Sequence, residues 1–160
     1  MDITGKEILF NALRRGTTPR PAWIPFVGVH GGSLLNMTAT EYLQSEDAIV
    51  EGQLRAVELY KPDGLPVVFD LQMEAEVLGC ALKWADDVPP SVVSHPLSDG
   101  SLNDLPEFST KAGRFPLVGE ATTRLREKIG HSVALYGLLT GPFTLLSHLR
   151  GGELFMDLLM

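Results

Sequence analysis

Apolar positions along this chain follow two spacings, one typical of buried strands and one typical of amphipathic helices. Three short apolar runs, at residues 22–29, 63–70 and 132–140, are expected to be strands. Between and after them, apolar residues recur three or four positions apart, which predicts helices. This alternation implies parallel strands joined by right-handed crossovers, so the fold class is α/β.

Local signals set the ends of the expected helices. Thr4 with Glu7, and Thr38 with Glu41, have the spacing of a capping box, in which side chains satisfy the first free backbone N–H groups of a helix. Ser45 is followed by two acids and opens a longer helix. The remaining signals are a glycine-rich bend after the first strand (HGGS), stops at Gly16, Pro62 and Gly130, and a first-turn proline, Pro142.

Two features suggest how the chain is organised. Residues 81–116 are rich in Pro, Ser and Asp and form an irregular excursion within a single domain spanning 1–160. The last apolar run, at residues 153–160, has no glycine stop or polar tail, and the third strand would leave an open edge. We therefore expect the N-terminal part of a larger barrel, about three βα units; a small three-layer α/β domain is the alternative. An open edge and an apolar last helix would favour self-association or a complementing chain.

Composition narrows the class of protein. Apolar residues make up 44% and charged residues 21%, as in globular proteins. A net charge of −7 disfavours a nucleic-acid or anionic-membrane surface. No apolar stretch approaches the roughly 20 residues of a membrane span, and the N-terminus does not have the apolar segment of a signal peptide. The single cysteine, Cys80, cannot form an internal disulfide, so a cytoplasmic location is expected.

Candidate chemistry lies where the strands end, because parallel α/β folds bind ligands at the carboxyl ends of their strands. The first strand leads to His30, the second ends at Asp70 and the third leads to Thr140; His148 follows four residues after Thr144 on one helical face. Each also has a structural interpretation. Asp70 could be the N-cap of a helix beginning at the next residue, His30 a loop histidine bonded to a carbonyl, and His148 a packing histidine.

Other residue clusters are weaker candidates. Glu74 and Glu76 diverge on a helix, because they are two positions apart, and are expected to be solvated acids of a first turn. The four histidines and Cys80 lack the spacing of a metal-ligand set, so we expect no metal site in this chain. No phosphate-binding loop or nucleophile elbow is present in the sequence.

Three segments, in order, resemble the uroporphyrinogen decarboxylase superfamily: RPAWIPFVGVHGG, FDLQMEAEVLGC and GPFTLLSHLRGGELF. This superfamily contains the porphyrin-making decarboxylase and cobalamin-linked methyltransferases similar to methylcobamide:coenzyme M methyltransferase. The resemblance implies a (β/α)8 (TIM) barrel about twice as long as this chain. It also implies that Asp70 stands where the decarboxylase has its essential aspartate, which contacts pyrrole nitrogens, and His148 where it has a site tyrosine. Phe26 and His30 stand where two arginines bind substrate carboxylates.

The absence of these two arginines changes the expected substrate, because arginine side chains are the natural partners of a substrate with several carboxylates. Within the resemblance, their absence favours methyl transfer. The donor would be a methyl-corrinoid (methylcobalamin type) or related C1 carrier, free or on a corrinoid protein, and the acceptor would be a thiol or another group. Asp70 would be catalytic, and His30, Thr140 and His148 would bind substrate. Zinc that activates a thiol would be held by residues in the second half of the barrel, outside this chain.

Two alternatives stay open. The first is a divergent uroporphyrinogen decarboxylase, a lyase of porphyrin biosynthesis in which Asp70 stabilises a protonated pyrrole intermediate. The second is a non-catalytic ligand-binding or partner subunit whose barrel has lost its chemistry.

Overall fold

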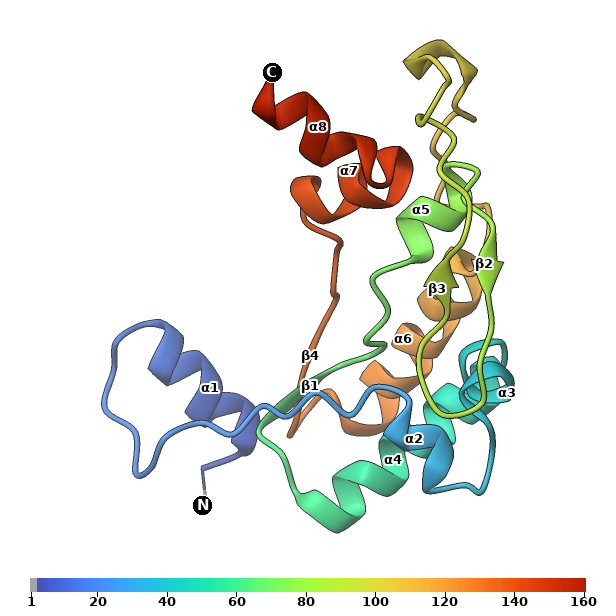
Figure 1. Cartoon of the computed structure of the whole chain (residues 1–160). Helices are drawn as coiled ribbons and strands as arrows, with labels where there is room; N and C mark the ends of the chain where they lie inside the picture. The colour runs from blue at the N-terminus through green and yellow to red at the C-terminus, as the bar shows by residue number, and fades with distance from the viewer. Residues whose placement is uncertain (1–2) are drawn as a thin grey trace.

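A computed structural model describes residues 3–160 of the chain. Two strands, β1 (Gly64–Pro66) and β4 (Ala134–Tyr136), pair in parallel, with Gly64 opposite Ala134 and Pro66 opposite Tyr136. The two longest helices, α4 (Glu46–Tyr60) and α6 (Phe115–Ile129), pack against each other beside this sheet (Figure 1). The parallel pairing across a helical crossover confirms the α/β class.

The predicted strand at residues 22–29 does not form. A single backbone bond connects this segment to the start of β1, from Asp63 N to Trp23 O at 2.9 Å. Pro21 and Pro25 have no N–H group and cannot contribute donors to a ladder, which explains the failure. The glycine-rich bend after it is a short helix, α2 (His30–Ser33), rather than an open turn.

The other two strands are shorter than predicted, although both exist. Beyond β1 the ladder continues for one bond, from Val67 N to Tyr136 O at 3.2 Å, and residues 68–70 leave the sheet. The parallel sheet of residues 3–160 thus has two strands where three were expected.

Helix boundaries agree closely with the capping signals. Complete capping boxes at Thr4 and Thr38 open α1 (Gly5–Leu13) and α3 (Ala39–Leu43). Ser45 caps α4, which ends at Lys61 in the left-handed conformation (φ 50°) just before Pro62. Gly130 is the C-cap of α6. The remaining helices are α5 (Met73–Val77), α7 (Pro142–Arg150), which has its proline in the first turn, and α8 (Glu153–Leu159).

Residues 81–114, between α5 and α6, hold two short antiparallel strands and a 3₁₀ turn. The strands β2 (Leu82–Lys83) and β3 (Ser91–Val92) pair with each other, and η1 (Leu102–Asp104) follows. This excursion is tied to α7 by a backbone bond from Leu97 N to Leu149 O at 2.9 Å. It therefore connects the upper part of the molecule in Figure 1 to the body below.

Two apolar clusters hold these parts together. The larger one joins the sheet to α3, α4 and α6, and the smaller one joins α5, the excursion and α7. The larger cluster contains Tyr42, Leu43, Ala48, Ile49, Val50, Val67, Val68, Ala121 and Leu125, and the smaller one contains Ala75, Cys80, Leu97 and Leu149.

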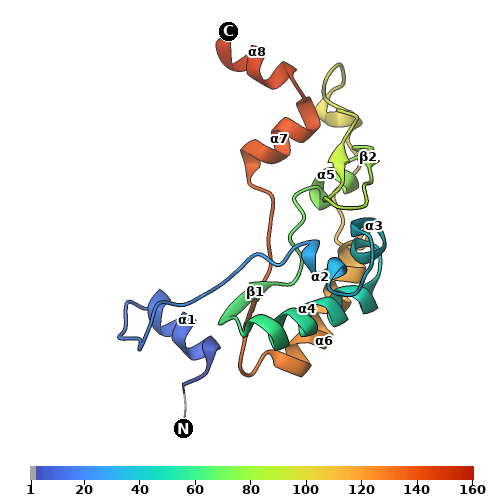
Figure 2. The same ribbon diagram turned by 60° about the horizontal axis from the view of Figure 1, so that its bottom comes forward.

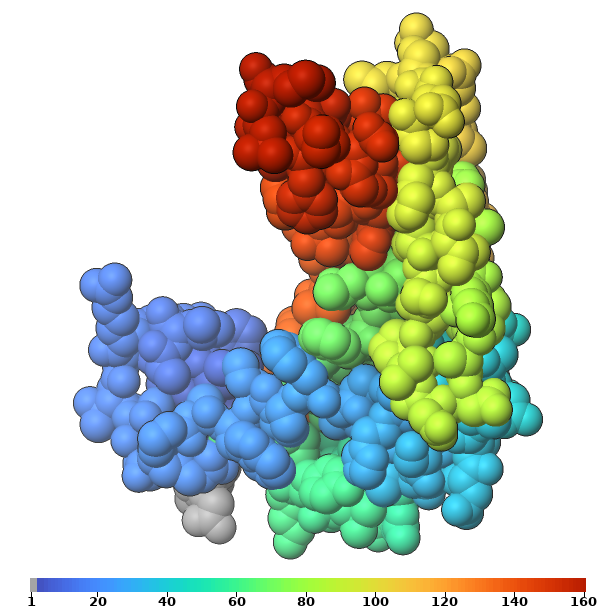
Figure 3. All heavy atoms as spheres, in the orientation of Figure 1, coloured from blue at the N-terminus to red at the C-terminus, as the bar shows by residue number. Residues whose placement is uncertain are grey.

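Helix α1 lies well apart from the α7–α8 pair (Figures 1 and 2). The space-filling view shows a wide notch between the blue and red ends of the chain (Figure 3). Beside α1 and β4 lies a cavity of about 250 Å³, and its lining residues Phe10, Leu13 and Ile24 are exposed. The full lining is Leu9, Phe10, Leu13, Ile24, Ala134, Leu135 and Tyr136. Among residues 3–160, no helix has the length and apolar character needed to cross a membrane.

Candidate functional site at the strand ends

Asp70 is buried just beyond β1, and both of its carboxylate oxygens are engaged. Oδ1 accepts a hydrogen bond from Gln72 N at 2.8 Å, and Oδ2 accepts one from Arg114 Nη1 at 2.5 Å. Helix α5 begins only at Met73, with Gln72 as its N-cap residue. The N-cap interpretation of Asp70 is therefore wrong: its carboxylate closes a turn before the helix and takes part in a buried ion pair.

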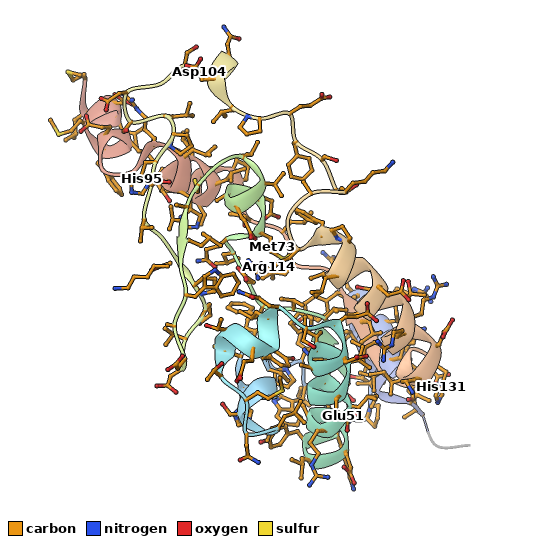
Figure 4. All side chains as sticks on the ribbon, turned by 90° about the vertical axis from the view of Figure 1, so that its right-hand side faces the viewer. Glu51, Met73, His95, Asp104, Arg114 and His131 are labelled. Carbon is orange, nitrogen blue, oxygen red and sulfur yellow. The ribbon has the colours of Figure 1, made fainter. Side chains whose placement is uncertain are left out.

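Arg114 is the partner that sequence reasoning missed. Its side chain is 8% exposed, and besides Asp70 it binds Glu76 through Nε–Oε2 at 2.9 Å. Its guanidinium carbon lies 4.9 Å from the centre of the Trp84 ring, a cation–π contact. In Figure 4, Arg114 lies where α5, the β2–β3 hairpin and the start of α6 converge. One signal was available, because a basic residue just before a helix opposes the helix dipole and needs a partner elsewhere.

Glu74 is not solvated as predicted, whereas Glu76 stays partly exposed (27%) and pairs with Arg114. Glu74 is 8% exposed, and its oxygens face Thr140: Oε1 accepts from Thr140 N at 3.1 Å, and Oε2 lies 2.7 Å from Thr140 Oγ1. The same hydroxyl lies 2.8 Å from Leu71 O. The prediction failed because α5 is covered by α7 and by the segment after β4, so its acids turn towards protein donors.

A cavity of about 210 Å³ borders Asp70. Its walls are apolar except for Asp70 itself and Thr122, and they come from α5, α6 and the segments after β1 and β4. Such a space can hold an apolar group beside Asp70, whose own side chain is completely covered. The lining residues are Val67, Val68, Asp70, Met73, Phe115, Val118, Gly119, Thr122, Gly137, Leu138 and Leu139.

His30 lies apart from the Asp70 cluster. It is exposed at the start of α2, and its Nε2 lies 2.8 Å from the Tyr60 hydroxyl rather than from a backbone carbonyl. Phe26 is 62% exposed and rests on the Phe69 ring, with centroids 4.8 Å apart. A cavity of about 240 Å³ lies here, and none of its six lining residues carries a permanent charge: Trp23, Pro25, Phe26, Val27, His30 and Tyr60.

His148 lies on α7, which packs against α5. Its backbone carbonyl accepts from His95 Nδ1 at 2.7 Å and from Cys80 Sγ at 3.5 Å. Its own Nε2 is buried and makes no hydrogen bond within residues 3–160. Burial raises the pKa of the Cys80 thiol, which disfavours a reactive thiolate there. No group of three His, Cys, Asp or Glu side chains that could hold a metal ion occurs in the described part of the chain.

The structure thus joins Asp70, through α5, to Thr140 and adds Arg114, Glu74 and Glu76, while His30 lines a separate pocket. Parallel α/β folds bind ligands at the carboxyl ends of their strands, so the buried carboxylate–arginine cluster there is the candidate site of this α/β protein.

The sequence profile of the uroporphyrinogen decarboxylase (URO-D) family matches residues 4–160. The chain therefore belongs to this family, which confirms the resemblance drawn from its three segments.

Individual relatives refine this placement. The methylcobamide:CoM methyltransferases MtbA of Methanosarcina acetivorans and Methanosarcina mazei are 30% and 29% identical, in each case over 98% of this chain and 48% of the relative. A solved methyltransferase structure from Methanosarcina mazei has a TM-score of 0.83 at 25% identity, again over 98% of this chain and 48% of its own. Uroporphyrinogen decarboxylase 2 of Arabidopsis thaliana is 28% identical over 69% of this chain. The chain spans about half the length of the methyltransferases it matches.

Proposed function

We propose that this chain forms the N-terminal part of a TIM-barrel enzyme that transfers a methyl group between a methyl-corrinoid, or a related C1 carrier, and a thiol or other acceptor. The observation that carries the proposal is the pairing of a fixed carboxylate, Asp70, with apolar ligand space at the strand ends. The similarity to the MtbA methyltransferases over nearly the whole chain supports it.

The pocket at His30 favours this substrate class over a polycarboxylate. A substrate with several carboxylates needs cations, and arginine supplies them best. Phe26 and His30 line an apolar pocket with Trp23 and Tyr60, and its only internal polar contact joins His30 to Tyr60. A corrinoid substrate presents large apolar surfaces, which such a pocket can cover.

Asp70 would orient the substrate. Its side chain is completely covered, so the carboxylate, fixed by the bonds from Gln72 and Arg114, would act on a ligand in the adjoining cavity through its charge. The Thr140 hydroxyl and backbone N–H, both held by Glu74, fix the neighbouring segment after β4.

In the transfer itself the methyl group leaves cobalt without its bonding electron pair and accepts a pair from the acceptor. The acceptor nucleophile is not supplied by Cys80, whose thiol is buried. Zinc bound outside this chain would activate an acceptor thiol in the complete protein.

The full-length protein containing this chain tests the proposal. Methylcobalamin and a small thiol are supplied, and we expect loss of methylcobalamin absorbance with formation of the methyl thioether, measured by mass spectrometry. Asp70→Asn should lower kcat/KM about 100-fold, because a misplaced substrate loses its reactive orientation. It should also lower the unfolding temperature, because the buried Arg114 loses a carboxylate partner, so kcat/KM is measured well below that temperature.

Asp47→Asn is the matched control, since Asp47 is an exposed aspartate paired with Arg124 far from the strand ends; it should leave kcat/KM unchanged. Equal losses in the two variants would contradict a specific role for Asp70. Conversion of uroporphyrinogen to coproporphyrinogen, without methyl transfer, would replace the proposal with the decarboxylase.

A further inference from the structure

Arg114 is the one buried cation of the strand-end cluster, and it reaches the site from the far end of the excursion. It is separated from Asp70 by 44 positions in the sequence, and its side chain is 8% exposed. We infer that Arg114 is a positioning residue, which holds the Asp70 carboxylate in its working orientation; the inference rests on the proposed function.

The contacts of Asp70 show why orientation depends on Arg114. A carboxylate on a single Cβ can rotate about two bonds, so two fixed donors are needed to lock it. Gln72 N holds Oδ1 and Arg114 Nη1 holds Oδ2. If the arginine is removed, one backbone N–H is left, and the carboxylate can turn about that bond.

The guanidinium is itself fixed from three sides. Nη1 binds Asp70, Nε binds Glu76, and the Trp84 ring lies against its face. Arginine suits this task because its planar group offers donors in fixed directions and a face for the Trp84 ring, whereas a lysine ammonium is a compact charge with rotatable donors. The cluster therefore requires an arginine and not simply a positive charge.

The adjoining cavity connects this arrangement to the substrate. Asp70 and Met73 line it from one side, and Phe115, the residue after Arg114, lines it from α6. Arg114 itself is not among the lining residues, so it acts through Asp70 and not by contact with a ligand. If Arg114 acts through Asp70, its substitution should lower kcat only when Asp70 is present. If its role is structural, through Glu76 or Trp84, the effect should not depend on Asp70.

A double-mutant cycle in the full-length protein makes that distinction. Arg114→Lys should lower kcat for methylcobalamin and a thiol about 10-fold with little change in KM, because the substrate binds but its orienting carboxylate is displaced. In an Asp70→Asn background the same change should have no further effect on kcat. Equal fold-losses in both backgrounds, or no loss in either, would overturn the inference.

Arg124→Lys is the matched control, because Arg124 lies on the same helix and pairs with Glu46 and Asp47 away from the site. It should leave kcat unchanged. Should Arg114→Lys not fold, Trp84→Leu replaces it: this variant keeps both ion pairs but frees the guanidinium face, and it should lower kcat only when Asp70 is present.

A crystal structure of the Arg114→Lys or Trp84→Leu variant separates the inference from the proposed function. We expect the Asp70 carboxylate to turn about its bond to Gln72 N, so that Oδ2 leaves its wild-type position. A carboxylate that keeps its wild-type position overturns the inference whatever the activity. If the carboxylate moves but the wild-type protein transfers no methyl group, the proposed function fails and the positioning contact remains.

Discussion

Asp63 is the second buried aspartate beside β1, at the opposite end of the strand from Asp70. Its Oδ1 lies 2.7 Å from Arg20 Nη2, and its Oδ2 lies 2.5 Å from Arg20 Nη1 and 2.8 Å from Trp23 N. The hydrogen bonds from the Arg20 guanidinium hold the pKa of Asp63 below its ordinary value of 3.8. Asp63 thus holds residues 20–23 beside the sheet, because this segment does not pair with the sheet as a strand.

The lowered pKa of Asp63 predicts a loss of stability in acid. A carboxylate whose pKa falls on folding contributes its full stabilisation above the unfolded pKa and loses it as the pH falls through the folded pKa. We therefore expect Asp63→Asn to lower the unfolding temperature at pH 7, and the difference from wild type to shrink below about pH 4. Circular dichroism melts between pH 7 and pH 2 measure it.

Glu58→Gln serves as the control for Asp63→Asn, because Glu58 pairs with Arg55 on the exposed face of α4. It should change the unfolding temperature little at any pH. A difference between wild type and Asp63→Asn that stays constant down to pH 2 would contradict the assigned cause.

At the scale of elements, two glycines inside helices have opposite surroundings. A Cβ added to Gly52 in α4 would lie 2.7 Å from Gly31 O and 2.7 Å from the Tyr42 ring, so α2 and α3 lie directly on that face. Around Gly119 in α6, no atom lies within 4 Å of an added Cβ. The first glycine permits close helix packing, whereas the second weakens its helix and borders the open space of the cavity beside Asp70.

These surroundings predict opposite signs for the same substitution. Gly119→Ala should raise the free energy of unfolding by about 0.5–1 kcal/mol, because alanine is the better helix former. Gly52→Ala should lower it by about 1–3 kcal/mol, because backbone atoms of α2 must move. Urea unfolding of both variants gives the comparison, and a gain in stability for Gly52→Ala would show that α2 is not packed as described.

Capping residues could be predicted from the sequence because they act over three or four positions. Thr4 and Thr38 each contact a glutamate three residues away, so the signal and the structure are equally local. The prediction of a strand at 22–29 was wrong although its apolar pattern is present in the sequence. A strand ladder needs backbone N–H donors, and two prolines have none to offer.

The site was only partly predictable, because its contacts are distant in the sequence. Asp70 and Thr140 were found from their places at strand ends. Arg114 reaches Asp70 across 44 positions, and Glu74 reaches Thr140 across 66. Nothing in helical spacing alone indicates such a partner, so Glu74 was expected in solvent.

At the scale of the whole molecule, one side of the sheet is covered and the other faces the notch beside α1. Leu13 is 69% exposed, Phe10 42% and Ile24 41%, all next to β4. Exposed apolar residues gathered in one place favour association in water.

We therefore expect the 160-residue chain, expressed by itself, to self-associate through this face. Leu13→Lys should shift the sedimentation velocity profile towards the monomer, because a charged side chain disfavours burial there. Leu102→Lys is the control: Leu102 is 74% exposed on the excursion, far from the notch. Equal shifts for the two variants would mean that association does not use the face beside α1.

The long connection between Asp70 and Arg114 has a consequence for how related proteins can diverge. The entropy of closing a loop grows only slowly with its length, about 0.6 kcal/mol for each doubling. Insertions at the exposed turn η1 therefore cost little, as long as Trp84 and Arg114 keep their places at the two ends of the excursion. Evolution can extend this segment freely at its tip while selection acts on the two residues at its base.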